Sequence, residues 1–253
     1  MEKGIPQILN EVAILSWKNR GLMHIEREEW RQAVLCFEQA LYESPEDSYI
    51  WGEKGKALVL LQSYYNALVC FNNAIRINSR DSELWYNRGV CLAQIERYDE
   101  AVNSFDQALA INPTDNSSLF NKALCLTGLS RYEEALSVFD YLIRLSPEDP
   151  SIWEKKGDIL MELNRTIEAM QSFEASVMLN PRNTRAMLKK ANLLFRYNRF
   201  EDAIKSYEKV IEIEPLNGVA YKNIAICLSR TGDESRAKDM MLKAKILLRE
   251  IDQ

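Results

Sequence analysis

Apolar and small residues follow one another along this chain at helical spacing, and the spacing itself recurs. Residues 82–115 show the pattern most clearly, with two successive faces made by Trp85, Gly89 and Leu92 and then by Ala101, Phe105 and Ala108. Both faces have the period of an amphipathic helix. Pro113 follows the second face, and a proline cannot continue a helix. The stretch therefore predicts two helices joined by a short turn, which together form a helical hairpin.

The hairpin recurs every 34 residues without an insertion. An alanine holds the same place in every copy: Ala33, Ala67, Ala101, Ala135, Ala169, Ala203 and Ala237. Four residues later stands a large residue: Phe37, Phe71, Phe105, Phe139, Phe173, Tyr207 or Met241. This period predicts an all-α protein of stacked hairpins. It divides the chain into seven repeats at 14–47, 48–81, 82–115, 116–149, 150–183, 184–217 and 218–251.

A 34-residue helix-turn-helix period with a tryptophan, a small residue, an alanine, an aromatic residue and a proline in fixed places resembles the tetratricopeptide repeat (TPR) family. The resemblance covers residues 14–251, nearly the whole chain. It implies an all-α, right-handed superhelix of seven helix-turn-helix repeats. It also implies that the first helices line a concave groove, which accepts an extended peptide or a partner helix.

The two ends of the array differ from its middle. Residues 1–13 precede the first repeat, and Pro6 with apolar residues after it predicts an extension of the first helix. A frayed terminus is the alternative. In repeats one to six, two apolar residues of the second helix stand seven positions apart and face the next repeat, but in repeat seven both are lysines, Lys238 and Lys245. We interpret repeat seven as a polar C-terminal cap that completes the solenoid.

Residues near the helix starts and crossings fit the same interpretation. An Asp or Asn precedes each first helix from the second repeat on, where it can accept from free backbone amides. These residues are Asp47, Asp81, Asp115, Asp149, Asn183 and Asn217. Each first helix also carries a small residue at its eighth position, such as Gly89. We expect this residue to be small because the paired second helix, with its alanine, approaches closely there.

Composition and charge narrow the function. A net charge of −5 argues against general nucleic-acid binding, which usually needs a basic surface. The longest uninterrupted aliphatic run, Ala57 to Leu61, is far too short to span a membrane, and the N-terminus lacks the pattern of a signal peptide. The five cysteines form no C-x-x-C pair, so we expect reduced, buried thiols. These features together predict a cytoplasmic protein.

No catalytic or cofactor motif is present in the sequence. Nucleotide-binding glycine loops, the H-E-x-x-H metal motif and the G-x-S-x-G nucleophile turn are all missing. The single histidine, His24, falls at a core position of the first helix. We therefore predict a protein that is not an enzyme, with no cofactor and no metal site, and binding is left as the expected function.

The candidate binding surface is the face of the first helices that points away from the packed positions, which we call the outer face. At 100° per residue, positions 2, 5, 6, 9, 12 and 13 of a repeat share this face. It is apolar in repeats three and four, where we expect an apolar ligand side chain, and basic in repeats six and seven, where we expect acidic groups. The candidate groove residues are Tyr86, Asn87, Val90, Phe120, Asn121, Leu124, Arg185, Lys189, Asn192, Arg196, Lys222, Asn223 and Arg230.

Two ladders of like residues run along the first helices. Position 6 carries Asn19, Asn87, Asn121 and Asn223, which either hydrogen-bond a ligand backbone or are ordinary helix-surface residues. Position 7 is basic in six repeats: Arg20, Lys54, Arg88, Lys122, Lys156 and Lys190. We expect a structural role for position 7, in which the stems pack and the charged heads reach water. A charged track for an acidic partner is the alternative.

The sequence thus predicts an interaction scaffold or adaptor whose ligand is a protein or peptide with apolar and acidic groups. Two alternatives stay open: self-assembly into a homo-oligomer, and service as an accessory subunit of a separate enzyme. Some family members bind chaperone tails through a clamp of two lysines, asparagine and arginine. Leu188 stands where the first lysine of that clamp is needed, so we do not expect that ligand.

Overall fold

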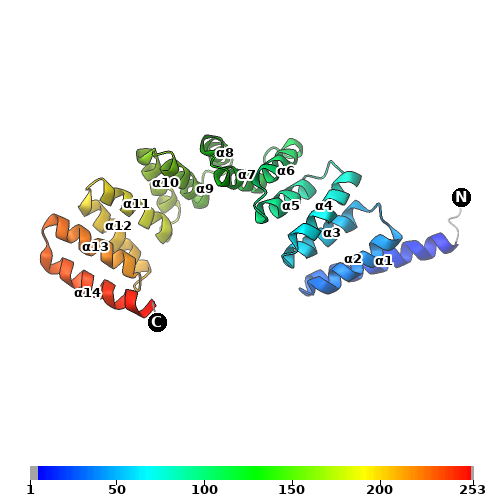
Figure 1. The fold of residues 1–253 in the computed structure, drawn as a ribbon, viewed down its shortest axis with the longest axis horizontal. Coiled ribbons are helices and arrows are strands. Elements are labelled where there is room, and N and C mark those ends of the chain that lie inside the picture. Colours follow the sequence, from blue (N-terminus) through cyan, green and yellow to red (C-terminus); the bar gives the residue numbers. More distant parts are fainter. Residues whose placement is uncertain (1–4, 252–253) are drawn as a thin grey trace. The chain divides into compact units, whose positions relative to one another are not determined.

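The structure is a computed structural model that describes residues 5–251, with side chains described for residues 12–248. Within that range it contains fourteen helices and no strand, which confirms the predicted all-α fold (Figure 1). The first helices of the hairpins are α1 (Ile5–Glu26), α3 (Ser48–Leu60), α5 (Ser82–Gln94), α7 (Asn116–Gly128), α9 (Pro150–Glu162), α11 (Thr184–Arg196) and α13 (Gly218–Thr231). The second helices are α2 (Trp30–Glu43), α4 (Tyr64–Ile77), α6 (Tyr98–Ile111), α8 (Tyr132–Leu145), α10 (Thr166–Leu179), α12 (Phe200–Ile213) and α14 (Glu234–Ile251).

The chain divides into two compact units, residues 1–138 and 139–253, and the boundary falls within α8. In the first unit the helices from α1 to α7 pack in sequence order, each of α1 to α6 against the next. The helices from α9 to α14 do the same in the second unit. Contacts between sequence neighbours build each unit, as expected of stacked repeats.

In four of the hairpins, the phenylalanine ring of the second helix lies directly on the glycine of the first helix. Phe105 is fully buried, and the Cβ that an alanine would add at Gly89 would lie 2.6 Å from Phe105 Cε1. The same contact is found at Gly21, Gly55 and Gly157, each facing its own phenylalanine. We expected the alanine of the second helix to require this glycine, but the ring requires it. The small residue therefore makes room for a side chain as well as bringing two helices together.

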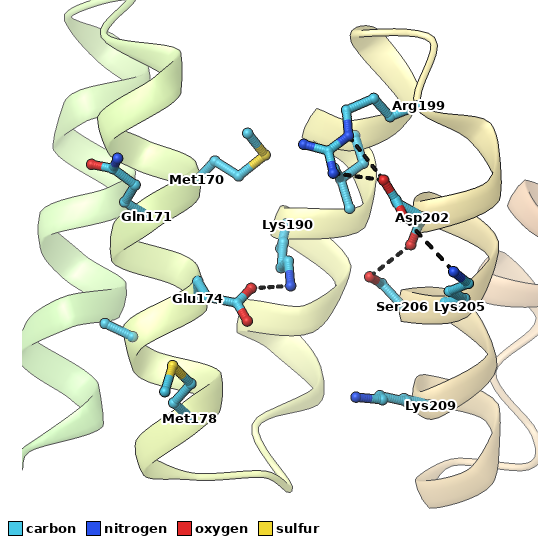
Figure 2. A pocket seen from close by; sticks show the side chains of 12 residues that line it. Met170, Gln171, Glu174, Met178, Lys190, Arg199, Asp202, Lys205, Ser206 and Lys209 are labelled. Atoms are coloured by element: carbon cyan, nitrogen blue, oxygen red, sulfur yellow. Dashed lines mark hydrogen bonds and ion pairs between the residues drawn. The ribbon is translucent and has the colours of Figure 1, made fainter.

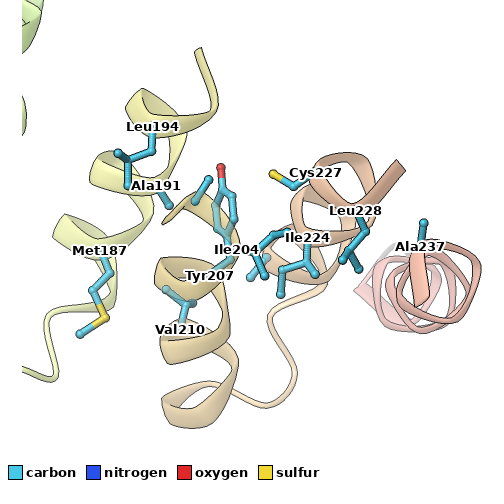
Figure 3. Close-up of a cluster of buried hydrophobic side chains, with 12 residues drawn as sticks. Met187, Ala191, Leu194, Ile204, Tyr207, Val210, Ile224, Cys227, Leu228 and Ala237 are labelled. Atoms are coloured by element: carbon cyan, nitrogen blue, oxygen red, sulfur yellow. The ribbon is translucent and has the colours of Figure 1, made fainter. Parts of the chain in front are cut away.

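The core continues from one hairpin to the next. Figure 3 shows such a cluster in the second unit, where Met187 of α11, Tyr207 of α12 and Ile224 of α13 are all buried. Ala237 of α14 belongs to the same cluster. Each of these hairpins therefore buries apolar side chains against its neighbour, and the core is a ribbon along the unit.

The predicted helix starts are confirmed. The side chains of all six capping residues accept a hydrogen bond from a backbone amide in the first turn of the next helix: Asp47, Asp81, Asp115, Asp149, Asn183 and Asn217. Helix α1 begins at Ile5, nine residues before Ile14, while residues 1–4 of the expected extension lie outside the described range. Lys238 and Lys245 are both exposed on α14, as a polar outer face requires.

The turn within each hairpin has a conformation that the sequence does not signal. In all seven hairpins, one residue of the turn between the two helices has a positive φ. Only in the last hairpin is this residue a glycine, Gly232. The others are Glu28, Gln62, Glu96, Ser130, Asn164 and Asn198, with φ between 56° and 61°. This left-handed conformation is unfavourable for most residues with a Cβ. The packing of the two helices therefore holds the turn in place.

None of the helices in the described range is both long enough and apolar enough to cross a lipid bilayer.

Candidate partner-binding faces of the first helices

Four of the candidate residues form an apolar patch on α5 and α7 in the first unit. Tyr86 and Val90 of α5 and Phe120 and Leu124 of α7 are all partly buried, and the two helices touch each other. The ring of Tyr86 also lies 6.0 Å from that of Phe105, centroid to centroid. Burial raises the pKa of the Tyr86 hydroxyl. Tyr86 therefore supports the hairpin core as well as contributing to the outer face.

The asparagine ladder is largely occupied by contacts within the chain. Asn121 Nδ2 donates to the backbone carbonyl of Ser117 at 3.0 Å, and Asn223 Nδ2 donates to Asn192 Oδ1 at 3.3 Å. The Nδ2 atom of Asn87 is buried and has no hydrogen-bond partner within the described range. These asparagines do not form a row of free amides on the surface, so the ladder alone does not define a ligand site.

Two of the five cations of the predicted basic end are paired with acidic residues of the preceding repeat. Lys189 Nζ lies 2.9 Å from Glu154 Oε1 and 2.6 Å from Asp158 Oδ1. Arg185 Nε lies 3.0 Å from the same oxygen of Glu154. Asn183 Nδ2 donates to the second oxygen, Glu154 Oε2, at 3.0 Å. The carboxylates of α9 thus face the cations of α11 and balance the charges of Arg185 and Lys189.

Glu154 is the centre of this network, and its side chain is only 11% exposed. Burial acts to raise the pKa of its carboxyl. Hydrogen bonds from Asn183 and Lys189 and the charges of Lys189 and Arg185 outweigh burial, so the pKa lies below its usual range. The folded protein therefore prefers the charged form of Glu154 more strongly than the unfolded chain does.

This preference predicts a pH dependence of stability. A carboxyl whose pKa is lowered by folding stabilises the protein above its unfolded pKa of about 4.3, and this contribution is lost as the pH falls through the lower folded value. In the Glu154→Gln variant we expect a smaller loss of unfolding free energy between neutral pH and the acid range than in wild type. Urea unfolding across this pH range measures the difference.

The matched control for this experiment is Glu162→Gln, an exposed residue on the same helix. It should retain the wild-type pH dependence. If the unfolding free energy of the Glu154→Gln variant has the same pH dependence as that of wild type, the charge of Glu154 does not stabilise the fold.

A small cavity lies on the same face of the second unit. It has a volume of about 180 Å³ and is lined by Asp158, Met161, Phe173, Lys189, Asn192, Leu193 and Arg196. We name it the first-helix pocket. Phe173 is buried, and Lys189 Nζ lies 5.6 Å from its ring centroid. Three candidate residues, Lys189, Asn192 and Arg196, are therefore brought together beside an apolar surface.

The remaining cations of the predicted basic end are exposed. Arg196, Lys222 and Arg230 make no ion pair within the part of the chain that the structure describes. Arg196 lines the first-helix pocket, whereas Arg230 lines a separate cavity of about 560 Å³ between α13 and α14. The free positive charge of the basic end thus lies at these three residues.

From the second repeat to the sixth, the basic residue at position 7 has a partner on the preceding second helix. Four of them make ion pairs: Lys54 with Glu38, Lys122 with Asp106, Lys156 with Asp140 and Lys190 with Glu174. Arg88 donates instead to Asn72 Oδ1 at 2.8 Å. Several also lie over the tryptophan of their own helix, as Lys54 does over Trp51 at 5.6 Å from the ring centroid. The ladder is structural and joins successive repeats.

The candidate reactive groups are occupied or buried. All five cysteines are free and buried. Burial raises the pKa of the Cys91 thiol to about 12 and those of Cys70, Cys125 and Cys227 to about 11, which makes them poor nucleophiles at neutral pH. Within the described range, no group of His, Cys, Asp and Glu is arranged to hold a metal ion. His24 is only partly buried and is hydrogen-bonded to Glu29, whereas we expected it in the core.

Comparison with protein families assigns most of the repeat array. A sequence model described as "Tetratricopeptide repeat" matches residues 82–115, and a second with the same description matches residues 120–184 and 154–218. Together these segments cover more than half of the chain. A comparison with curated proteins gives no match.

Solved structures share the fold. The C-terminal part of a TPR repeat-containing protein from Cytophaga hutchinsonii matches with a TM-score of 0.79 and 16% identity, covering 90% of this chain and 93% of that one. PilF of Pseudomonas aeruginosa matches with a TM-score of 0.66 and 19% identity, covering 86% and 98%. YrrB, described as a TPR protein with an unusual peptide-binding site, matches with a TM-score of 0.60 and 21% identity, covering 70% and 91%. At these identities the likeness shows the fold alone.

Proposed function

The chain belongs to the tetratricopeptide repeat family, and on that premise we propose that it is a non-enzymatic scaffold that binds a peptide or a partner helix on the outer faces of its first helices. Repeats of this family build surfaces for protein–protein interaction. The apolar patch of Tyr86, Val90, Phe120 and Leu124 offers one such surface in the first unit, and the first-helix pocket offers another in the second.

The first-helix pocket carries the proposal, because it combines an apolar floor with unused donors. Phe173 and Leu193 are buried and supply the floor. Asn192 Oδ1 accepts from Tyr207 Oη at 2.5 Å and from Asn223, so the orientation of the amide is fixed and Nδ2 remains as a donor. Arg196 adds an exposed guanidinium at the rim. A binding site of this type needs few polar groups if they are well placed.

This arrangement sets the chemistry of the ligand. A pocket of about 180 Å³ accommodates one small or medium-sized apolar side chain. A guanidinium binds a carboxylate through two parallel hydrogen bonds. We therefore propose a ligand segment in which an apolar residue lies next to a single acidic residue. This is a smaller demand for acidic groups than the sequence suggested, because Glu154 and Asp158 already neutralise Arg185 and Lys189.

The test compares Arg196→Glu with a control of equal charge change, Arg182→Glu, which alters an exposed residue in the loop before α11. A quantitative pull-down from native extract identifies bound proteins, and fluorescence anisotropy then measures the affinity of a peptide from each. We expect Arg196→Glu to weaken binding roughly tenfold or more, because it replaces an attractive charge with a repulsive one.

The control should bind like wild type. Equal affinity of all three proteins would place recognition elsewhere and contradict the proposed site. If the mass in light scattering rises with protein concentration and no other protein is captured, self-assembly becomes the better account.

A further inference from the structure

A second surface lies between the second helices α10 and α12, with α11 between them (Figure 2). A cavity of about 590 Å³ runs there, within the size range of ligand-binding clefts. We name it the methionine–lysine groove after the residues that set its character, which are Met170, Met178, Leu194, Lys205 and Lys209. None of them belongs to the first-helix face, so binding in this groove does not depend on the proposed function.

One wall of the groove is apolar and adaptable. Met170 and Met178 of α10 stand eight residues apart, and both line the groove (Figure 2). Met178 is 74% exposed, so most of its side chain is open to a ligand. Leu194 of α11 is buried at the base. Methionine side chains are unbranched and polarisable, and they are common on surfaces that accept partner helices.

The charges that line the groove are unbalanced. Four basic side chains face two acidic ones. Lys190 is paired with Glu174, and Arg199 Nη2 lies 2.6 Å from Asp202 Oδ2. These two pairs use both carboxylates and leave the two lysines of α12 as the excess charge.

Lys205 and Lys209 are the two uncompensated cations. The side chain of Lys205 is 74% exposed, and its Nζ lies 3.9 Å from Asp202 Oδ1, at the limit of an ion pair. Lys209 is exposed and makes no ion pair within the described range. Residues four apart lie on one face of a helix, so the two ammonium groups stand about one turn apart. The groove thus presents a local positive charge on a chain whose net charge is −5.

This combination is specific to one place in the array. The positions of Lys205 and Lys209 carry no basic residue in repeats one to five, where they are Leu35 and Gln39, Val69 and Asn73, Asn103 and Gln107, Ser137 and Tyr141, and Gln171 and Ala175. A groove between neighbouring second helices results from the stacking of hairpins, but a methionine wall opposite a lysine pair does not. The chemistry is therefore a property of these residues and not of the fold.

We propose that the methionine–lysine groove docks an acidic amphipathic helix of a partner protein. Its apolar side chains pack on Met170 and Met178, and two carboxylates four residues apart on its polar edge meet Lys205 and Lys209. The spacing of the carboxylates on the partner helix then equals that of the lysines on α12. Binding of a helix in a groove is an established mode of peptide recognition, and charge complementarity fixes its orientation.

The probe is a synthetic, fluorescein-labelled amphipathic peptide of about 16 residues, long enough to form a helix, with leucines on one face and two glutamates four residues apart beside them. The control peptide has the same composition, but its glutamates lie on the opposite face of the helix. We expect the first peptide to bind the full chain, with an affinity that falls as salt is added. The second peptide should bind roughly tenfold more weakly.

Variants locate the site. Lys205→Glu with Lys209→Glu should weaken binding of the first peptide roughly tenfold or more. Lys238→Glu with Lys245→Glu changes the net charge equally at exposed positions of α14 and should leave the affinity unchanged. Absence of binding, equal affinity for the two peptides, or equal loss in both lysine variants would each overturn the proposal.

Discussion

Replacing Phe105 by alanine is expected to lower the free energy of unfolding by about 3–5 kcal/mol, the usual cost of removing a large aromatic side chain from a packed core. The ring is fully buried, it lies against Gly89, and its centroid is 6.0 Å from that of Tyr86. Because Gly89 has no side chain, it cannot move in to fill the space. Urea unfolding followed by circular dichroism measures the loss.

The loss should begin locally. In a stack whose repeats contact only their neighbours, a weakened repeat opens before the rest. Hydrogen exchange in the Phe105→Ala variant should therefore accelerate first in α5 and α6. The control is Asn103→Ala, an exposed residue on the same helix, which should stay within about 0.5 kcal/mol of wild type. Uniform acceleration in both variants would argue against the ring as the centre of the hairpin.

Replacing Gly89 by alanine is expected to destabilise the protein by about 1–3 kcal/mol, the cost of overpacking a core. Helix propensity alone predicts the opposite, a gain of about 1 kcal/mol. The new methyl group would lie 2.6 Å from Phe105 Cε1, so the ring would have to leave its position. The sign of the measured change decides between local propensity and packing.

Two further variants sharpen this test. In Gly52→Ala the new Cβ would lie 3.0 Å from Leu84 Cδ2, the end of a flexible side chain that can turn aside. That variant should be neutral or slightly stabilised. Adding Phe105→Leu to Gly89→Ala should recover part of the loss, because the smaller side chain makes room for the methyl group. A Gly89→Ala protein as stable as Gly52→Ala would show that the ring is not tightly held.

The fold could be predicted because each of its determinants is local and is repeated seven times. Helical periodicity places the apolar faces, and a capping residue such as Asp115 marks each start and does accept the expected hydrogen bond. The turn conformation was not predictable, because residues such as Glu96 carry no signal for positive φ. There the packed helices dictate the backbone, and the sequence shows no preference.

The candidate site was less predictable, because its electrostatics depend on contacts between repeats. The sequence of α11 alone suggests that Arg185 and Lys189 are unpaired cations. Their partners, Glu154 and Asp158, lie more than twenty residues earlier in the chain. Knowing that these residues meet requires the geometry of one hairpin on the next. The partners of the position 7 ladder are easier to predict, because they recur at a fixed spacing. Sixteen residues before each basic residue after the first stands an acid or an amide, such as Glu38 before Lys54.

That ladder also bears on how such a chain can grow. Each of the first six repeats presents an acid or amide on its second helix and a cation on its first, as Asp106 and Lys122 do across one junction. A tandem duplication of an inner repeat therefore copies both the cation of the first helix and the acid or amide of the second helix. The new copy can pair with the repeat before it and with the repeat after it, and no compensating substitution is needed. Evolution can change the length of the array by recombination, while point mutation on the outward faces changes what each copy binds.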